Sequence, residues 1–234
     1  MKVVLLAGGL GTRLSEYTSS IPKPMVKIGN LPILVHLINI YKKYGYNDFI
    51  IAAGYKKKII TDYFNNTNFN CNIKVINTGK ASMTGGRLLE LKKYLKNQTF
   101  LLTYGDGLSN ININSLINFH KKNKNIITIT AVRPPARFGN ITMKYNKVIN
   151  FKEKTQMNAG WINGGFFVIN SQFFKYLKNK KTILEKEPLE KAAKDGELYA
   201  FKHHGFWACM DTKRDKDYLE DLVKKNKAFW INEK

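Results

Sequence analysis

Cysteine, acidic residues and long apolar runs are all scarce in this sequence. Among its 234 residues there are two cysteines, Cys71 and Cys209. Two cysteines without metal-ligand spacing give neither a disulfide framework nor a zinc site, so we expect a reduced, cytoplasmic protein. The apolar run at 3–7 is too short for a membrane span or for the apolar part of a secretory signal. We therefore expect no membrane partner.

The shortage of acidic residues makes the chain strongly basic. Lys and Arg number 39 against 17 Asp and Glu, which gives a formal net charge of +22. A surface this basic can attract nucleic acids, anionic membranes or phosphorylated metabolites. Nearly all the basic residues are lysines, scattered in short groups such as 56–58, 121–122 and 178–181. This scatter is typical of a general compositional bias rather than of one nucleic-acid groove, so we expect no nucleic-acid partner.

Apolar and amphipathic segments alternate through the first 132 residues. Short apolar runs, typical of buried strands, lie at 3–7, 49–53, 73–76, 99–103 and 126–132. Segments with helical spacing lie between them, at 33–44, 57–64, 87–95 and 113–122. The alternation predicts an α/β fold, a Rossmann-like mixed and mainly parallel sheet flanked by helices.

The pattern changes in the second half of the chain. Segments 140–145 and 147–151 predict a hairpin with its tight turn at Asn146. A long strand is predicted at 161–169, and helical stretches follow around Leu189 and Tyr218. We expect a small antiparallel annex beside the parallel sheet. No segment has linker composition, so we predict one domain over 1–234, with halves at about 1–132 and 133–234.

A glycine-rich loop at 8–13 follows the first predicted strand. Its glycines allow backbone N–H groups to approach an anion closely. The loop lacks the Gly-Lys-Ser/Thr of a Walker A motif, and Leu14 stands where a dinucleotide fingerprint needs its third glycine. These departures exclude a nicotinamide-dependent enzyme. Lys23 then stands between Pro22 and Pro24 on a stiff segment, which favours a lysine held ready to meet a charge.

These motifs together resemble the sugar-phosphate nucleotidyltransferases. The matches begin with Gly-Gly-x-Gly-Thr-Arg-Leu at 8–14 and Pro-Lys-Pro-Met-Val-x-Ile-Gly-x-x-Pro-Ile-Leu at 22–34. Further stretches are similar to the glucose-1-phosphate cytidylyltransferase branch, at 77–79, 83–88, 103–107, 137–139, 161–167 and 210–212. The matches follow in order from residue 3 to about residue 230, so the resemblance covers essentially the whole chain.

The resemblance implies Mg²⁺-dependent transfer of CMP from CTP to a small phosphorylated acceptor. A phosphate oxygen of the acceptor would attack the α-phosphorus of CTP, and pyrophosphate would leave. Glucose 1-phosphate is the implied acceptor and CDP-glucose the implied product. Two alternatives stay open at this point. One is the same chemistry on a non-sugar acceptor such as phosphoglutamine in capsule modification, and the other is a non-catalytic basic module that binds nucleotide or nucleic acid.

The resemblance also implies a nucleotide site in the first half of the chain. The loop amides and Arg13 would hold the β- and γ-phosphates, and Lys23 would neutralise charge at the α-phosphorus. Asp106 and Asp211 would hold Mg²⁺, although Asp106 could be only a turn residue and Asp211 only a helix N-cap. We expect catalytic roles for Arg13, Lys23 and Asp106. The implied nucleotide-binding residues are Leu6, Ala7, Gly8, Gly9, Gly11, Thr12, Arg13, Lys23, Ser82, Gly86, Arg87 and Asp106.

Base selection is assigned by resemblance to the segment 82–87. An arginine fork aimed at O2 and N3 of cytosine would reject uracil, because uracil carries a proton on N3. Arg87 matches the base-reading arginine of the family, and Ser82 stands where relatives usually have Thr. The alternative is that Arg87 is a surface residue at the start of a helix.

The second half of the chain corresponds to the acceptor side. Lys154 would bind the acceptor phosphate, and Glu153 and Asn163 would bind hydroxyls or another polar group. The full set of implied acceptor residues is Tyr104, Gly139, Glu153, Lys154, Asn163 and Gly164. Thr155 departs from the proline that follows Glu-Lys in the family, and 157–160 replaces its Gly-Asp-Gly.

A second departure concerns assembly. Only 65–72 separates a predicted helix from the strand that leads to Asn77, whereas the family usually has a longer stretch there that is associated with subunit contacts. We expect a homo-oligomer, and the short segment leaves its size open.

Overall fold

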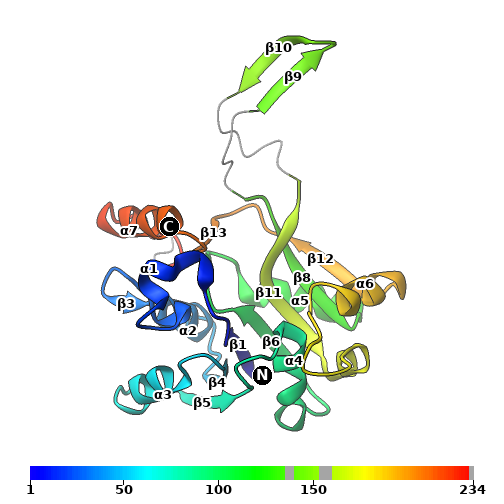
Figure 1. Cartoon of the computed structure of the whole chain (residues 1–234). Helices are drawn as coiled ribbons and strands as arrows, with labels where there is room; N and C mark the ends of the chain where they lie inside the picture. The colour runs from blue at the N-terminus through cyan, green and yellow to red at the C-terminus, as the bar shows by residue number, and fades with distance from the viewer. Residues whose placement is uncertain (135–139, 153–159, 232–234) are drawn as a thin grey trace.

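A seven-stranded sheet forms the centre of the molecule (Figure 1), in a computed structural model that describes residues 1–134, 140–152 and 160–231. Its strands are β1 (Val3–Ala7), β4 (Asp48–Ala53), β5 (Asn72–Asn77), β6 (Thr99–Tyr104), β8 (Ile127–Val132), β11 (Ile162–Asn170) and β12 (Leu198–Lys202). They lie in the order β12-β8-β11-β6-β1-β4-β5. Every neighbouring pair is parallel except those of β11, which runs antiparallel between β6 and β8. The predicted mixed, mainly parallel sheet is confirmed.

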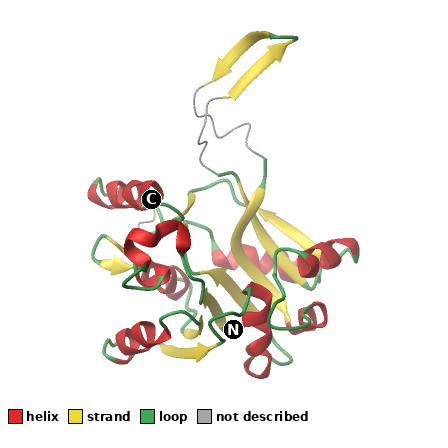
Figure 2. Cartoon of the chain, in the orientation of Figure 1, coloured by secondary structure: helices red, strands yellow, loops and turns green. Residues whose placement is uncertain are grey.

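Helices cover both faces of this sheet (Figure 2). Side chains of β1 alternate between the two faces, with Val3 and Leu5 in one core cluster and Val4 and Leu6 in the other. Into the first cluster pack α2 (Ile33–Lys42), α3 (Lys57–Asn65), α5 (Ile113–Asn123) and α7 (Lys213–Lys224). Into the second pack α4 (Thr84–Glu90), η5 (Ser171–Tyr176) and α6 (Glu187–Lys194). The described residues also contain short helical turns, at η1 (Thr12–Leu14), α1 (Ser15–Thr18), η2 (Lys23–Met25) and η3 (Lys92–Tyr94).

In the described residues, three small antiparallel pairs of strands accompany the main sheet. They are β2 (Lys27–Ile28) with β3 (Leu31–Pro32), β7 (Gly107–Ser109) with β13 (Trp207–Cys209), and β9 (Asn140–Lys144) with β10 (Lys147–Lys152). The last pair is the predicted hairpin, and its turn has a positive φ of 53° at Tyr145. The predicted antiparallel annex is thus a separate two-stranded sheet, which stands apart from the central sheet in Figure 1.

One predicted helix has different bounds in the structure. The expected helix 87–95 begins at Thr84, as α4, and changes to the 3₁₀ turn η3. Two consecutive glycines argue against a helix start on propensity alone. Here they serve packing, because a Cβ added at Gly86 would lie 2.1 Å from the Lys180 carbonyl oxygen. The backbone N–H of Gly86 donates to the Thr182 carbonyl at 3.0 Å, so a distant segment completes the first turn of α4.

The order of strands places a crevice beside β1. From β1 the chain moves outward to β4 and β5, and then it crosses to β6 on the other side of β1. The loops that follow β1 and β6 therefore separate at the carboxyl end of the sheet, where ligands of open α/β folds bind. In the described part of the chain, no helix is both long enough and apolar enough to cross a membrane.

Candidate active site

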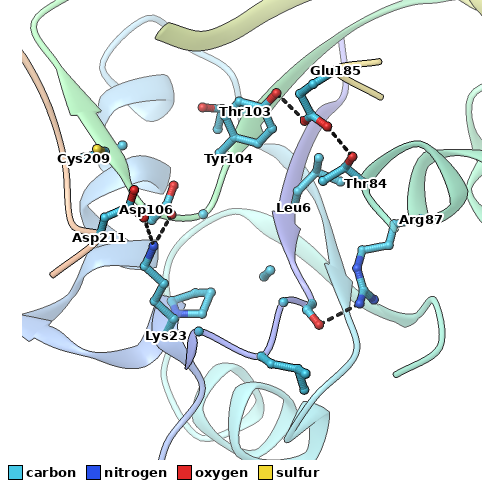
Figure 3. Close-up of a pocket in the computed structure, with 18 of the residues that line it drawn as sticks. Leu6, Lys23, Thr84, Arg87, Thr103, Tyr104, Asp106, Glu185, Cys209 and Asp211 are labelled. Atoms are coloured by element: carbon cyan, nitrogen blue, oxygen red, sulfur yellow. Dashed lines mark hydrogen bonds and ion pairs between the residues drawn. The ribbon is translucent and has the colours of Figure 1, made fainter. Parts of the chain in front are cut away.

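A cavity of about 930 Å³ lies at this crevice (Figure 3). Its volume is in the usual range for small-molecule sites. The residues predicted from the sequence that line it are Leu6, Ala7, Gly8, Gly9, Gly11, Thr12, Arg13, Lys23, Ser82, Arg87, Tyr104, Asp106, Asn163, Gly164 and Asp211. Segments that are far apart in the sequence therefore meet at one site.

Lys23 lies between the two aspartates on one wall of the cavity. Its Nζ is 2.5 Å from Asp106 Oδ2 and 2.7 Å from Asp211 Oδ1. Only 12% of the Lys23 side chain is exposed, and Figure 3 shows the three groups pointing at one another. Burial lowers the pKa of Lys23, but the charges and hydrogen bonds of Asp106 and Asp211 outweigh it and raise that pKa above its ordinary value. The lysine is therefore a fixed cation held by two carboxylates.

The helix-cap interpretation of Asp211 is wrong. Thr212 is the N-cap of α7, and its side chain accepts a hydrogen bond from the Asp215 backbone N–H in a capping box. The Asp211 carboxylate is instead engaged by Lys23 and by Arg13, whose Nη1 lies 2.7 Å from Asp211 Oδ2. Asp106 does lie in the turn after β6, and its side chain also points into the cavity.

The glycine loop closes the same end of the cavity. Gly11 has a φ of 67°, and an added Cβ would lie 2.9 Å from the Thr18 side chain. Its carbonyl accepts hydrogen bonds from the Leu14 N–H and from Thr18 Oγ1, both at 3.0 Å. A left-handed backbone at this point suits glycine, and it turns the chain from β1 into η1. Arg13 on η1 is largely exposed, and its ion pair with Asp211 directs its guanidinium toward the cavity.

Arg87 is buried and tied to the backbone around it. Its Nη1 donates to Thr78 Oγ1 at 2.9 Å and to the Gly79 carbonyl at 2.7 Å. Its Nη2 donates to the carbonyls of Gly8 at 2.7 Å and Lys80 at 3.3 Å. With 4% of the residue exposed, the surface-arginine alternative is wrong. The guanidinium joins the glycine loop to the segment after β5, and its role in reading a base stays a prediction.

Four predicted site residues are not placed at the cavity by the described structure. Gly86 faces Lys180 rather than the cavity, so the glycine is explained by its close approach to the Lys180 backbone. Gly139, Glu153 and Lys154 lie outside the described residues.

Known proteins are similar to this chain over nearly its whole length. A profile of the nucleotidyl transferase family matches residues 2–226. The chain belongs to this family. Glucose-1-phosphate cytidylyltransferases from Salmonella typhimurium (strain LT2) and Salmonella typhi are each 45% identical to it over 253 residues, with 98% of this chain and 98% of each relative covered. A crystal structure of UDP-glucose pyrophosphorylase complexed with UDP-glucose shares the fold, with a TM-score of 0.74 at 18% identity, over 96% of this chain and 98% of that one.

The family resemblance identified from the motifs is therefore confirmed, and the protein is a nucleotidyltransferase, an enzyme. The alignment with the Salmonella enzymes is longer than the 234 residues of this chain. The relatives thus contain residues that this nucleotidyltransferase lacks.

Trp207 and Glu185 are among the residues that line the cavity of this nucleotidyltransferase but were not predicted from the sequence. Trp207 lines the cavity and donates from Nε1 to the Gly164 carbonyl at 2.7 Å. Glu185 lines it from the segment before α6, with its carboxylate beside Tyr104 and Thr84. No local pattern marks either residue. The pair of glycines in α4 was an indirect signal for Glu185. It indicates that another segment packs closely against α4, but it does not say which segment.

Proposed function

We propose that this nucleotidyltransferase transfers CMP from CTP to glucose 1-phosphate, giving CDP-glucose and pyrophosphate. An oxygen of the acceptor phosphate would form a bond to the α-phosphorus, and the bond from that phosphorus to the bridging oxygen of the β-phosphate would break. The two Salmonella relatives support this choice by their names. The observation that carries it is the meeting of the glycine loop, Lys23 and two carboxylates at one end of the cavity.

This end of the cavity is suited to a triphosphate. The loop at 8–13 turns at the carboxyl end of β1, where its backbone N–H groups can reach phosphate oxygens. Arg13 and Lys23 add two positive charges beside it. Preorganised charge of this kind stabilises the transition state of phosphoryl-type transfer without covalent participation by the protein.

The two carboxylates fit a hard divalent cation. Their oxygens already converge on a positive charge, the Lys23 ammonium. Among residues 1–134, 140–152 and 160–231, no three or more Asp, Glu, His or Cys side chains gather as a metal site. We propose that Asp106 and Asp211 hold Mg²⁺, with phosphate oxygens and water as the other ligands. Bound there, Mg²⁺ would neutralise phosphate charge.

Base selection would take place at the other side of the glycine loop. Ser82 and Arg87 line the cavity together with Lys80, and Ser82 Oγ donates to the Thr78 carbonyl at 2.5 Å. Cytosine offers acceptors at O2 and N3, whereas uracil has a donor at N3, so an Arg87 fork that turned from its backbone carbonyls to these two atoms would favour cytosine. Arg87 holds this part of the cavity wall in place, because its guanidinium donates to the backbone carbonyls of Gly8, Gly79 and Lys80.

A substrate panel tests this proposal. Each of CTP, UTP, GTP, ATP and dTTP is offered with glucose 1-phosphate, other sugar 1-phosphates and phosphoglutamine, while pyrophosphate release and product mass are measured. We expect CTP with glucose 1-phosphate to give the largest kcat/KM, with an Asp106→Asn variant as the inactive control. Faster turnover with another nucleotide would contradict the base assignment, and faster turnover with another acceptor would contradict the assignment of glucose 1-phosphate.

A further inference from the structure

Glu185 is a charged residue on the cavity wall that no motif of the sequence marks. Its Oε1 accepts a hydrogen bond from the Tyr104 hydroxyl at 2.5 Å, and its Oε2 accepts one from Thr84 Oγ1 at 2.7 Å. Figure 3 shows it on the opposite side of the cavity from Lys23. Glu185 thus connects the end of β6, which leads to Asp106, with the first turn of α4.

The backbone around Glu185 is fixed against α4. The Met83 N–H donates to the Lys180 carbonyl at 2.9 Å, and the Leu184 N–H donates to Thr84 Oγ1 at 2.9 Å. Leu184 itself is fully buried in the second core cluster. Because the residue before it is anchored in this way, the carboxylate of Glu185 is held in one place before any ligand arrives.

The neighbouring polar groups are already occupied by one another. Asn163 Nδ2 donates to the Tyr104 hydroxyl at 3.2 Å, and Asn163 Oδ1 accepts from the Gly165 N–H at 3.0 Å. Burial, together with the charge of Glu185, raises the pKa of Tyr104, so its phenol stays a donor to Glu185. The carboxylate has about four lone-pair positions, and Tyr104 and Thr84 use two of them. Glu185 is exposed to the cavity and keeps acceptor capacity.

The charge distribution indicates what Glu185 can bind. Arg13 and Lys23 lie at the end with the glycine loop, where Asp106 and Asp211 pair with both cations, and the backbone N–H groups of the loop are what favour phosphates there. A carboxylate repels phosphate, and it accepts hydrogen bonds from neutral hydroxyls. The part of a substrate that suits Glu185 is therefore an uncharged polyol.

We propose that Glu185 is a specificity-determining residue, which accepts a hydrogen bond from a sugar hydroxyl while Tyr104 and Thr84 hold its carboxylate. The sugar is either the ring of the acceptor or the ribose of the nucleotide, and the two sources share this chemistry. The inference rests on the proposed function, since it requires a sugar-bearing substrate in this cavity.

A cycle of residue and hydroxyl deletions tests the contact. Wild type and Glu185→Ala are assayed with CTP, 2′-deoxy-CTP and 3′-deoxy-CTP, and with glucose 1-phosphate and its 2-, 3-, 4- and 6-deoxy analogues. For one of these hydroxyls, we expect its removal from the substrate to lower the kcat/KM of wild type about ten- to hundred-fold. Removal of the same hydroxyl should change the kcat/KM of Glu185→Ala little, because the acceptor is already absent. Whether the hydroxyl lies on the nucleotide or on the acceptor identifies the source. If, for every hydroxyl, its removal lowered kcat/KM by the same factor in wild type and in Glu185→Ala, Glu185 would contact none of them and the proposal would be overturned.

Two further variants separate this contact from a structural effect. Glu185→Met keeps most of the side-chain volume but has no acceptor oxygen, and it is expected to lose the same hydroxyl discrimination while its melting temperature stays within a few degrees of wild type. Glu190→Met, at an exposed residue on α6, is the matched control and should keep wild-type discrimination. Discrimination retained in Glu185→Met as in Glu190→Met would overturn the proposal. A wild-type enzyme inactive with every nucleotide and acceptor would instead contradict the proposed function itself.

Discussion

At the scale of single residues, the arrangement around Lys23 is the most informative. Its ammonium lies between Asp106 and Asp211, the two carboxylates that we propose hold Mg²⁺. If Asp106 and Asp211 hold Mg²⁺ as proposed, the lysine would compete with the metal ion for the same oxygens. Transfer of Lys23 from the carboxylates to a phosphate would couple metal binding to nucleotide binding.

Replacement of Lys23 by alanine should separate these two roles. In the absence of nucleotide we expect the variant to bind Mg²⁺ about tenfold more tightly than wild type, because a competing charge is gone, an effect of about 1.4 kcal/mol. Turnover should fall by at least about a hundredfold, because charge at the α-phosphorus is no longer neutralised. Calorimetric titration with Mg²⁺ measures the first effect. The exposed Lys27→Ala is the control, and an unchanged affinity in Lys23→Ala would refute the competition.

Arg87 provides a second residue-scale prediction, since it binds three carbonyls and a hydroxyl in a buried position. Arg87→Ala should lower the free energy of unfolding by about 3 kcal/mol, because it leaves buried acceptors without donors. Urea denaturation measures this loss, with the exposed Arg214→Ala expected to stay within about 0.5 kcal/mol of wild type. If Arg87→Ala lost CTP binding but kept the stability of wild type, the hydrogen bonds of Arg87 to the backbone around the cavity would not stabilise the fold.

At the scale of elements, α4 depends on a segment that follows it by almost a hundred residues. Carbonyls of Lys180 and Thr182 accept from backbone N–H groups of its first turn, and its glycines make room for them. This contact brings Glu185 to the cavity. A change that disrupts the first turn of α4 should therefore also change the shape of the cavity near Ser82.

An alanine at Gly86 tests this packing. The added Cβ would lie 2.1 Å from the Lys180 carbonyl oxygen, so the two segments must separate. We expect the free energy of unfolding to fall by about 1–3 kcal/mol, despite the better helix propensity of alanine. Gly160→Ala, where an added Cβ meets nothing within 4 Å, should be neutral in the same denaturation experiment. Equal stability of the two variants would contradict the close approach.

The elements also show how far the sequence alone predicts this protein. Continuous apolar runs predicted β1 and β6 directly, and the structure brings Lys23, Asp106 and Asp211, which the motifs had singled out, together at one cavity. The start of α4 was missed because its glycines are used for packing, which local propensity does not register. β12 and Glu185 were missed for a similar reason, since their positions depend on contacts between distant segments.

At the scale of the whole molecule, the segment around Trp230 is hydrogen-bonded to α2. His36 Nε2 lies 2.9 Å from the Ile28 carbonyl, and Trp230 Nε1 lies 3.2 Å from His36 Nδ1. The ring of His36 therefore connects three parts of the chain within the first core cluster. It can accept from Trp230 only while its Nδ1 carries no proton.

Mild acid should weaken this connection. Burial lowers the pKa of His36 below its ordinary value, although the Ile28 carbonyl and Glu220 partly oppose the effect. Because the unfolded chain binds this proton more readily, the contribution of His36 to stability is complete above about pH 6.5 and is lost as the pH falls below it. Between pH 7.5 and 5.5 wild type should lose more free energy of unfolding than His36→Gln does. Equal losses in the two proteins would contradict the assignment.

The most direct test of the central claim is a crystal structure of the protein with CTP and Mg²⁺ but no acceptor. The cavity should contain one nucleotide, with its triphosphate over the loop at 8–13 and its cytosine beside Ser82 and Arg87. Lys23 should then contact a phosphate rather than both carboxylates. Nucleotide bound elsewhere, or a glycine loop without phosphate at saturating CTP, would contradict the account.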